Sequence, residues 1–385
     1  LAVYEHVSRL KSIPLIGKPL FGIKDKFLHI PSFYPIRDLS EQTFQVRMLV
    51  SSINKGLCNG VLQKIQEKYL PMVTSFYAPA VAADLAGYDQ IYCIICDADI
   101  NRVWVAPEPW DSRIRYFAPC GKAAQRLKAY GVSEDKIFIT GFPLHDSLLG
   151  GRNLAVLKND LGQRLSYLDP KGKFKALHGK NAEYFLGKDN LEFRNERVLT
   201  ITFAVGGAGA QKETAQKIIK GIKKKLENNE IRIILVAGIR KEVYEYFAEI
   251  AKTEGIPQES YKIIYSENME GYFNLFNRAI RETDILWTKP SELSFYSGLG
   301  IPVIMTQAIG SQEKFNRKWL REIGAGIKQE KPEYADQWLI DLLNDGRLAE
   351  AAWSGFLKAR KLGIYKIYEV LETGSMITET SPVLR

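Results

Sequence analysis

Glycines and small polar residues cluster directly after an apolar run in the second half of this 385-residue chain. The run covers residues 199–205, and a helical pattern begins near Glu213. Glycines let a backbone approach an anion closely, and a helix N-terminus offers unpaired N–H groups and a favourable dipole. The segment therefore indicates a diphosphate cradle or, as the alternative, a tight strand-to-helix turn without a ligand. The candidate ligand-binding residues are Gly206, Gly207, Ala208 and Gly209. The segment lacks the Gly-Lys-Ser/Thr ending of a P-loop.

A second polar cluster lies between Thr288 and Asn316, in two loops that each follow an apolar strand pattern. Ser291 can cap the helix that follows the first strand, and Glu292 falls in its first turn, where the helix dipole favours a carboxylate. A carboxylate there can also accept hydrogen bonds from two ribose hydroxyls. Ligands in open α/β sheets bind beyond the carboxyl ends of the strands, where both loops belong. The candidate donor-binding residues of the two loops are Lys289, Ser291, Glu292, Gly310, Ser311, Gln312, Glu313 and Asn316.

In the first half, Asp97 and Asp99 follow the apolar run 91–96. A carboxylate at a strand end can orient an acceptor hydroxyl or act as a general base. The alternative for Asp97 is a local cap or salt bridge. Cys93 and Cys96 lie three residues apart on the same predicted strand, so they point to opposite faces and are expected to be buried thiols. With four histidines in the chain and no second cysteine pair, we expect no metal site.

Strand-like and helix-like runs alternate along the chain, which predicts an α/β fold with parallel sheets, and 385 residues suggest two domains. The predicted parts are an N-terminal domain over 1–150, a linker with a helical insertion over 151–195, a nucleotide-binding domain over 196–346, one helix over 347–372 and a disordered tail over 373–385.

The net charge of +9 suggests an anionic partner. Residues 9–26 mix apolar and basic side chains with two prolines and two glycines, which fits an irregular segment packed on the first sheet or an element that contacts a lipid surface. Because no apolar run approaches eighteen residues, no membrane-spanning helix is expected. Nucleic acid is not an expected partner, since the lysines are spread rather than clustered on one recognition helix. We expect a cytoplasmic protein, with peripheral contact to the inner face of the membrane as a further option.

The second half resembles the donor domain of the family-28 type of glycosyltransferases. This group includes the transferase that adds N-acetylglucosamine to lipid I and the mono- and diglycosyldiacylglycerol synthases. The resemblance rests on the glycine-rich segment 206–211, on Gly-Ile-Pro-Val-Ile at 300–304 followed by Gly-Ser-Gln-Glu-Lys-Phe-Asn at 310–316, and on Gly-Ala-Gly at 324–326. The first half is similar to the acceptor domain of the same group at 94–105, 116–119 and 137–143.

The resemblance implies a GT-B fold, in which two Rossmann-like domains face each other across a cleft and a C-terminal helix crosses back to the first domain. It also implies a UDP-sugar as the donor substrate, no cofactor, no obligatory metal and inversion at the anomeric carbon. The mixed basic and apolar segment 9–26 suggests a lipid or polyprenyl carrier as the acceptor. Carried over by position, Gly207 and Ala208 contact the diphosphate and Ile239 flanks the base through its backbone. Gln312 and Glu313 then face the sugar or diphosphate, and Glu292 holds the ribose.

Two features depart from the family pattern. The family's ribose glutamate corresponds in position to Phe295, so Glu292 lies one helical turn too early and needs a shorter turn before the helix. The family's Gly-Gly-His loop has no counterpart in residues 1–70, so it lies upstream of Leu1 or the protein works differently. Two other functions therefore stay open: a UDP-sugar epimerase or hydrolase of GT-B fold, and a catalytically silent nucleotide-sugar-binding protein.

Overall fold

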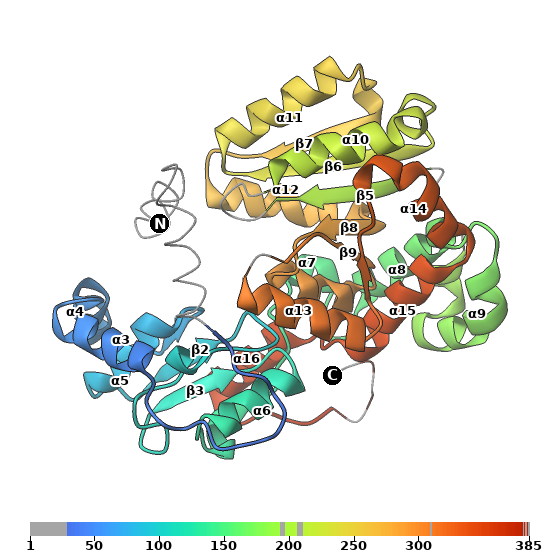
Figure 1. The fold of residues 1–385 in the computed structure, drawn as a ribbon. Helices are drawn as coiled ribbons and strands as arrows, with labels where there is room; N and C mark the ends of the chain where they lie inside the picture. Colours follow the sequence, from blue (N-terminus) through green and yellow to red (C-terminus); the bar gives the residue numbers. More distant parts are fainter. Residues whose placement is uncertain are drawn as a thin grey trace.

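The computed structural model describes residues 29–192, 197–205, 211–308, 310–379, 381 and 383. Two parallel β-sheets, each flanked by helices, form two α/β domains that lie one above the other in Figure 1. The predicted fold class of two Rossmann-like domains is confirmed. Segment 9–26, for which packing on the first sheet and contact with a lipid surface were the two interpretations, lies outside the described residues.

The first domain is built on a four-stranded sheet in the order β1-β2-β3-β4, with every neighbouring pair parallel. Helix α5 packs against β1, β2 and β3, and α6 packs against β4. The strands are β1 (Met72–Thr74), β2 (Ile91–Ile94), β3 (Ile114–Phe117) and β4 (Ile137–Phe138). The helices are α3 (Phe44–Asn54), α4 (Asn59–Lys68), α5 (Tyr77–Leu85), α6 (Gly121–Ala129) and α7 (Asp146–Leu149), with the short 3₁₀ helices η1 (Arg102–Trp104) and η2 (Glu134–Lys136).

The second domain is built on a six-stranded parallel sheet in the order β10-β9-β8-β5-β6-β7. The strands are β5 (Leu199–Ala204), β6 (Ile231–Gly238), β7 (Tyr261–Tyr265), β8 (Ile285–Thr288), β9 (Val303–Met305) and β10 (Gly326–Lys328). The helices are α10 (Lys212–Glu227), α11 (Lys241–Thr253), α12 (Met269–Glu282), α13 (Ser311–Glu322) and α14 (Ala335–Asn344), with η4 (Gln258–Ser260), η5 (Glu292–Leu299) and η6 (Pro332–Tyr334).

Strands β5 and β8 are buried along their whole length, as expected of central strands covered on both faces. From β5 the chain builds β6 and β7 on one side and then returns to build β8, β9 and β10 on the other. The strand order therefore reverses between β5 and β8. In an open α/β sheet, this switch point is where the crevice for a ligand forms at the carboxyl ends of the strands.

The predicted linker forms two helices that belong to the core. They are α8 (Ala155–Leu168) and α9 (Lys173–Leu186), followed by η3 (Lys188–Leu191). Helix α8 buries Leu157, Leu161, Leu165 and Leu168, four leucines that recur at helical spacing along one face. We predicted short helical patterns here but not their full burial, because the many lysines and glycines of the segment obscure the leucine stripe.

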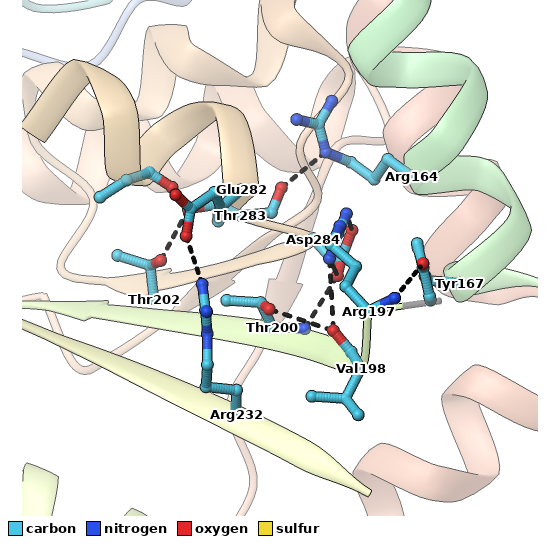
Figure 2. A network of polar contacts seen from close by, with 11 residues as sticks. Arg164, Tyr167, Arg197, Val198, Thr200, Thr202, Arg232, Glu282, Thr283 and Asp284 are labelled. Carbon is cyan, nitrogen blue, oxygen red and sulfur yellow. Dashed lines mark hydrogen bonds and ion pairs between the residues drawn. The ribbon is translucent and has the colours of Figure 1, made fainter. Parts of the chain in front are cut away.

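A buried polar network joins α8 to the amino ends of β5 and β8 (Figure 2). The Arg164 guanidinium donates to the carbonyl oxygens of Thr283 at 2.7 Å and Leu299 at 2.8 Å. Arg197 donates two hydrogen bonds to the Asp284 carboxylate, at 2.5 and 2.6 Å, and this carboxylate has no exposed surface. The network fixes the end of the sheet opposite to the carboxyl ends of the strands, so it provides structural support there.

The predicted single helix over 347–372 is instead two helices, α15 (Arg347–Lys358) and α16 (Gly363–Thr373). The buried ammonium group of Lys361 donates to the carbonyl oxygens of Phe356 and Ala359, which satisfies groups that the end of α15 leaves open. Helix α15 packs against η5 of the second domain, whereas Ile367 and Val370 of α16 pack on the first sheet. The predicted return of the chain to the first domain is therefore present.

The tail that we predicted to be disordered contacts α16 in its described part. The Lys366 ammonium donates to the Ile377 carbonyl at 2.7 Å and pairs with Glu379 at 2.7 Å. The Ile377 N–H donates to the Glu369 carboxylate. Because Lys366 is nearly fully buried, these contacts hold residues 377–379 against the helix.

Candidate active site

The carboxyl ends of β5, β8 and β9 lie side by side at one edge of the second sheet, because β8 pairs with both β5 and β9. The glycine-rich residues 206–210, which we predicted as the diphosphate cradle, lie outside the described residues, as does residue 309. The described part of the site is therefore the rim of this predicted cradle.

Gln211 joins two of these loops, and sequence reasoning did not assign it a role. Its side-chain amide accepts from the Thr306 hydroxyl at 2.6 Å and donates to the Gln307 carbonyl at 3.0 Å. Its backbone has φ of 68°, the left-handed region that a non-glycine residue adopts only when its surroundings hold it there. The start of α10 is thus fixed beside the loop that leads into α13. Its place directly after the glycine-rich segment was the available signal in the sequence.

Lys289 and Glu313 connect the loop after β8 to the first turn of α13. The Lys289 ammonium lies 2.8 Å from a Glu313 carboxylate oxygen, and both side chains are partly buried. Gly310 has an extended backbone and directly precedes α13, a helix of twelve residues. The first N–H groups of this helix therefore point out of its N-terminus at the same edge of the sheet. Gln312 is half-buried, and the Ser311 hydroxyl accepts a hydrogen bond of 3.4 Å from the N–H of Ile30. A cation, a helix N-terminus and polar side chains therefore lie together where an anionic group can bind.

Glu292 begins η5 directly after the loop that follows β8. The predicted α-helix at this position is a 3₁₀ helix, and the Ser291 side chain does not cap it. The Glu292 side chain is exposed. Burial, with a smaller contribution from the nearby Glu292 carboxylate, raises the pKa of Tyr272 to about 12, so the carboxylate lies near this phenol. The tight start of η5 supplies the shorter turn that a ribose contact by Glu292 requires, and the contact itself stays a prediction.

Ile239 follows Gly238 at the carboxyl end of β6, on the other side of β5 from Lys289. It is 38% exposed, and the nearby Tyr244 and Tyr265 rings lie 5.1 Å apart between centroids. The structure therefore places Ile239 at the same sheet edge as the predicted cradle, as its proposed contact with a base requires.

Asp97, in the loop after β2, brings the first domain into this group. Its carboxylate accepts a hydrogen bond of 2.7 Å from the Asn316 amide of α13. Burial raises the pKa of Asp97 to about 6, and the negative charges of Glu292 and Glu313 add to this shift. The Asn316 hydrogen bond and the Lys289 charge act in the opposite direction. A carboxylate with a pKa of about 6 is suited to accept a proton near neutral pH.

Asp99 lies elsewhere, although it is only two residues further along the chain. Its carboxylate has no exposed surface and accepts two hydrogen bonds from the buried Arg126 guanidinium, at 2.7 and 2.9 Å. Arg126 also donates to the carbonyl of Pro31. We had considered Asp99 as a catalytic candidate with Asp97. In the structure, it is half of a buried ion pair inside the first domain, which leaves Asp97 as the candidate base.

Asn316 also differs from its expected place as a donor contact. It has no exposed surface, and its amide is hydrogen-bonded to groups of the protein on both sides of the domain junction. The remaining candidates of the second domain with a described side chain lie around the carboxyl edge of its sheet, as predicted.

The fold defines a two-domain protein of GT-B type, with the candidate site at the domain junction. A structure from Listeria monocytogenes, named as a UDP-N-acetylglucosamine 2-epimerase, superposes with a TM-score of 0.51 at 14% sequence identity and covers 86% of this chain and 80% of that chain. At this identity, the similarity concerns the fold alone.

Sequence comparison points to lipid-directed glucosyltransferases. A processive diacylglycerol β-glucosyltransferase from Bacillus pumilus is 21% identical over 260 residues, which are 67% of this chain and 55% of the relative. Another protein of this name, from Bacillus subtilis, is 24% identical over 137 residues, or 34% of each chain. The chain thus spans about half the length of the first relative. A family model described as a domain of unknown function (DUF6938) matches residues 242–373. The predicted resemblance to glycosyltransferases of the diacylglycerol type is confirmed by these similarities.

Proposed function

We propose that this protein is a glycosyltransferase that moves a hexose from a UDP-sugar to a hydroxyl group of a lipid acceptor. The observation that carries the proposal is the hydrogen bond between Asp97 of the first domain and Asn316 of α13, the helix whose first turn holds Glu313 and its ion-pair partner Lys289. An ionisable carboxylate of the first domain thus lies beside the helix whose N-terminus and neighbouring lysine can bind an anionic group. Similarity to the diacylglycerol glucosyltransferases supports the lipid acceptor.

In the proposed reaction, the UDP diphosphate binds at segment 206–210 and at the N-termini of α10 and α13. The acceptor oxygen forms a bond to the sugar C1 while the bond from C1 to the diphosphate oxygen breaks. Asp97 accepts the acceptor proton, and UDP leaves with the bonding electron pair. Lys289 and the two helix dipoles stabilise the negative charge that develops on the leaving group, so no metal ion is required.

We propose that the transfer inverts the anomeric carbon. Asp97 belongs to the first domain, whereas the predicted diphosphate contacts belong to the second. An acceptor activated from the first domain attacks C1 on the face opposite to the leaving group. One displacement of this kind inverts the anomeric configuration.

The surface of α3 and α4 supports contact with a membrane. No residue of α4 is buried, and the segment 44–68, which covers both helices and the turn between them, carries four exposed basic residues but only one acidic residue. The exposed apolar side chains of this region are Phe44, Met48, Leu57, Val61, Tyr69 and Leu70. The exposed basic side chains are Arg47, Lys55, Lys64 and Lys68. Within the described part of the chain, no helix has the length and apolar character needed to cross a bilayer. We therefore propose peripheral binding to an anionic bilayer, in which apolar side chains insert and basic ones meet the headgroups.

Donor binding and transfer can be tested separately. Calorimetry with UDP should give binding in the wild type, and the absence of binding at millimolar concentration would remove the donor-site proposal. Transfer should be measured with UDP-glucose and diacylglycerol in vesicles, and Asp97→Asn should lower kcat by about 10²- to 10⁴-fold while UDP still binds. Unchanged turnover in this variant would contradict the assignment of the base.

Membrane contact has its own test, because it does not depend on turnover. In flotation with phosphatidylglycerol vesicles, the double variant Lys64→Glu/Lys68→Glu should lose binding, and the loss should be smaller with neutral phosphatidylcholine. Lys241→Glu/Lys252→Glu, which reverses two exposed charges on α11, serves as the matched control. Equal loss in the control and the double variant would show that net charge alone is responsible.

A UDP-sugar epimerase or hydrolase is the second candidate. The carboxylates of Asp97, Glu292 and Glu313 lie near one another, and the Listeria structure is named as an epimerase. Incubation with UDP-N-acetylglucosamine and no acceptor distinguishes the two functions. An epimerised or hydrolysed product would support this candidate, and no conversion without an acceptor would support the transferase.

A further inference from the structure

Asn316 belongs to the second domain, but its side chain is bonded into the first. Its carbonyl oxygen accepts from the N–H of Ala98 at 2.7 Å, and its amide nitrogen donates to the Asp97 carboxylate at 2.7 Å. The same nitrogen lies 3.3 Å from the carbonyl oxygen of Pro290. Both the nitrogen and the oxygen of this fully buried amide are therefore occupied by groups of the protein.

These partners require an amide in one orientation. The Asp97 carboxylate accepts hydrogen bonds when ionised, and the Ala98 N–H can only donate. A flipped amide would place acceptor against acceptor and donor against donor. An aspartate would set two carboxylates against each other, and an alanine would leave the N–H without this partner. The position therefore selects for asparagine by its chemistry as well as by its size.

The donor-side residues are connected to this bridge through one turn of α13. Glu313 lies three residues before Asn316 and pairs with Lys289, which immediately precedes the bridge partner Pro290. Residues three apart lie on the same side of a helix. A shift of α13 on donor binding would thus move the partner of Asp97 as well.

We infer that Asn316 is a positioning residue, which holds the Asp97 carboxylate toward the acceptor only when the first domain is closed onto α13. The inference rests on the proposed function, in which Asp97 takes the acceptor proton. This arrangement couples donor binding to acceptor activation, because α13 carries the donor-side residues Gln312 and Glu313 and also the residue that orients Asp97. A second domain that is displaced from the first leaves Asp97 without this hydrogen bond.

The test compares Asn316→Ala and Asn316→Asp with a control at the same interface. The ammonium group of Lys122, on α6 of the first domain, lies 2.7 Å from Glu322 of α13. Lys122→Ala thus removes a contact between the domains without altering the hydrogen bonds of Asp97. We expect Asn316→Ala to lower kcat by about 10- to 100-fold, since general-base catalysis contributes 10²–10⁴-fold in full. The UDP Kd should stay within about threefold, and Lys122→Ala should change kcat by less than about twofold.

The pH profile separates positioning from a general loss of structure. The Asn316 hydrogen bond favours ionised Asp97, so its loss should move the acid limb of kcat/KM to higher pH. Asn316→Asp should move the limb further, because a second carboxylate repels the first. The groups that also face Asp97 are Lys289, Glu292 and Glu313, and they are unchanged in both variants.

Three results would overturn the inference. They are an unchanged kcat in Asn316→Ala, a loss of UDP affinity as large as the loss of kcat/KM, and an unmoved acid limb. If the wild type does not transfer sugar, the proposed function fails, but positioning can still be measured. The titration of Asp97, followed by carboxylate ¹³C NMR and assigned with Asp97→Asn, should move to higher pH in Asn316→Ala. An unmoved titration refutes the contact in solution.

Discussion

Asp97 carries its charge in a partly buried position, and Asp97→Asn removes the charge while it nearly preserves the shape of the side chain. Burial is the largest cause of the rise of its pKa from 3.8 to about 6. This rise in pKa means that the native environment disfavours the ionised form of Asp97, relative to the protonated form, by about 3 kcal/mol. The ionised side chain therefore lowers the free energy of unfolding of the native protein at neutral pH. Asparagine should recover much of this loss, since its carbonyl can still accept from Asn316.

The sign follows from proton binding. Between pH 3.8 and about 6, the native state holds a proton on Asp97 that the unfolded state has lost, so stability falls as pH rises. The decrease is complete above about pH 7. The variant has no such group, so its advantage in unfolding free energy should reach about 2–3 kcal/mol at pH 8 and should grow by about 1–2 kcal/mol between pH 5 and pH 8.

Urea denaturation of both proteins at pH 5, 6, 7 and 8 measures this advantage directly. Asp135→Asn, at an exposed site in η2, serves as the control and should change the unfolding free energy by less than about 0.5 kcal/mol. The reasoning is refuted if Asp97→Asn is less stable than the wild type at pH 8, or if the gap between them is the same at pH 5. If Asp97→Asn is more stable than the wild type but inactive, the Asp97 charge is retained for function at a cost in stability.

Three further predictions concern the support of the site and the donor contacts. Arg164→Met should lower the unfolding free energy by about 3–5 kcal/mol, measured by urea denaturation, because it leaves two short hydrogen bonds to buried carbonyls unmade. Gly221→Ala should lower the melting temperature, since a Cβ there would lie 2.1 Å from the Pro332 carbonyl oxygen, whereas Gly179→Ala, with its nearest neighbour at 3.6 Å, should raise it. Lys289→Met should weaken UDP binding by about tenfold in calorimetry if its charge meets the diphosphate, and an unchanged Kd would contradict that contact.

The second sheet could be predicted from the sequence because its central strands are rich in apolar and β-branched residues. The apolar strand pattern expected before Thr288 corresponds to β8, and the loops that follow β8 and β9 lie at the expected sheet edge. The residue pattern of a strand is a local signal, and the placement of ligand-binding loops at the carboxyl ends of strands follows from the order of the elements. Both can be obtained from a single sequence.

The contacts across the domain junction could not be predicted in the same way. Asp97 and Asn316 are separated by 219 residues, and nothing in their local sequences indicates that they meet. Asp97 and Asp99 look equivalent in the sequence, but a buried arginine from α6 holds only Asp99. The break between α15 and α16 contains neither glycine nor proline and depends on the buried Lys361. The first two features are decided by partners that are distant in the chain, whereas Lys361 lies only five residues from its partner Phe356.

The return of α16 to the first sheet has a consequence for the order of synthesis and folding. Tyr92 and Phe117 form a small apolar cluster with Ile367 and Val370, and the entire second domain separates the two pairs along the chain. Domains generally fold as units while the ribosome is still extending the polypeptide. Here the first domain is translated early, but one face of its sheet stays uncovered until α16 emerges. During that interval the nascent chain exposes an apolar surface, so binding by chaperones should be strongest while the second domain is being synthesised. Fragments that end before Gly363 should aggregate for the same reason.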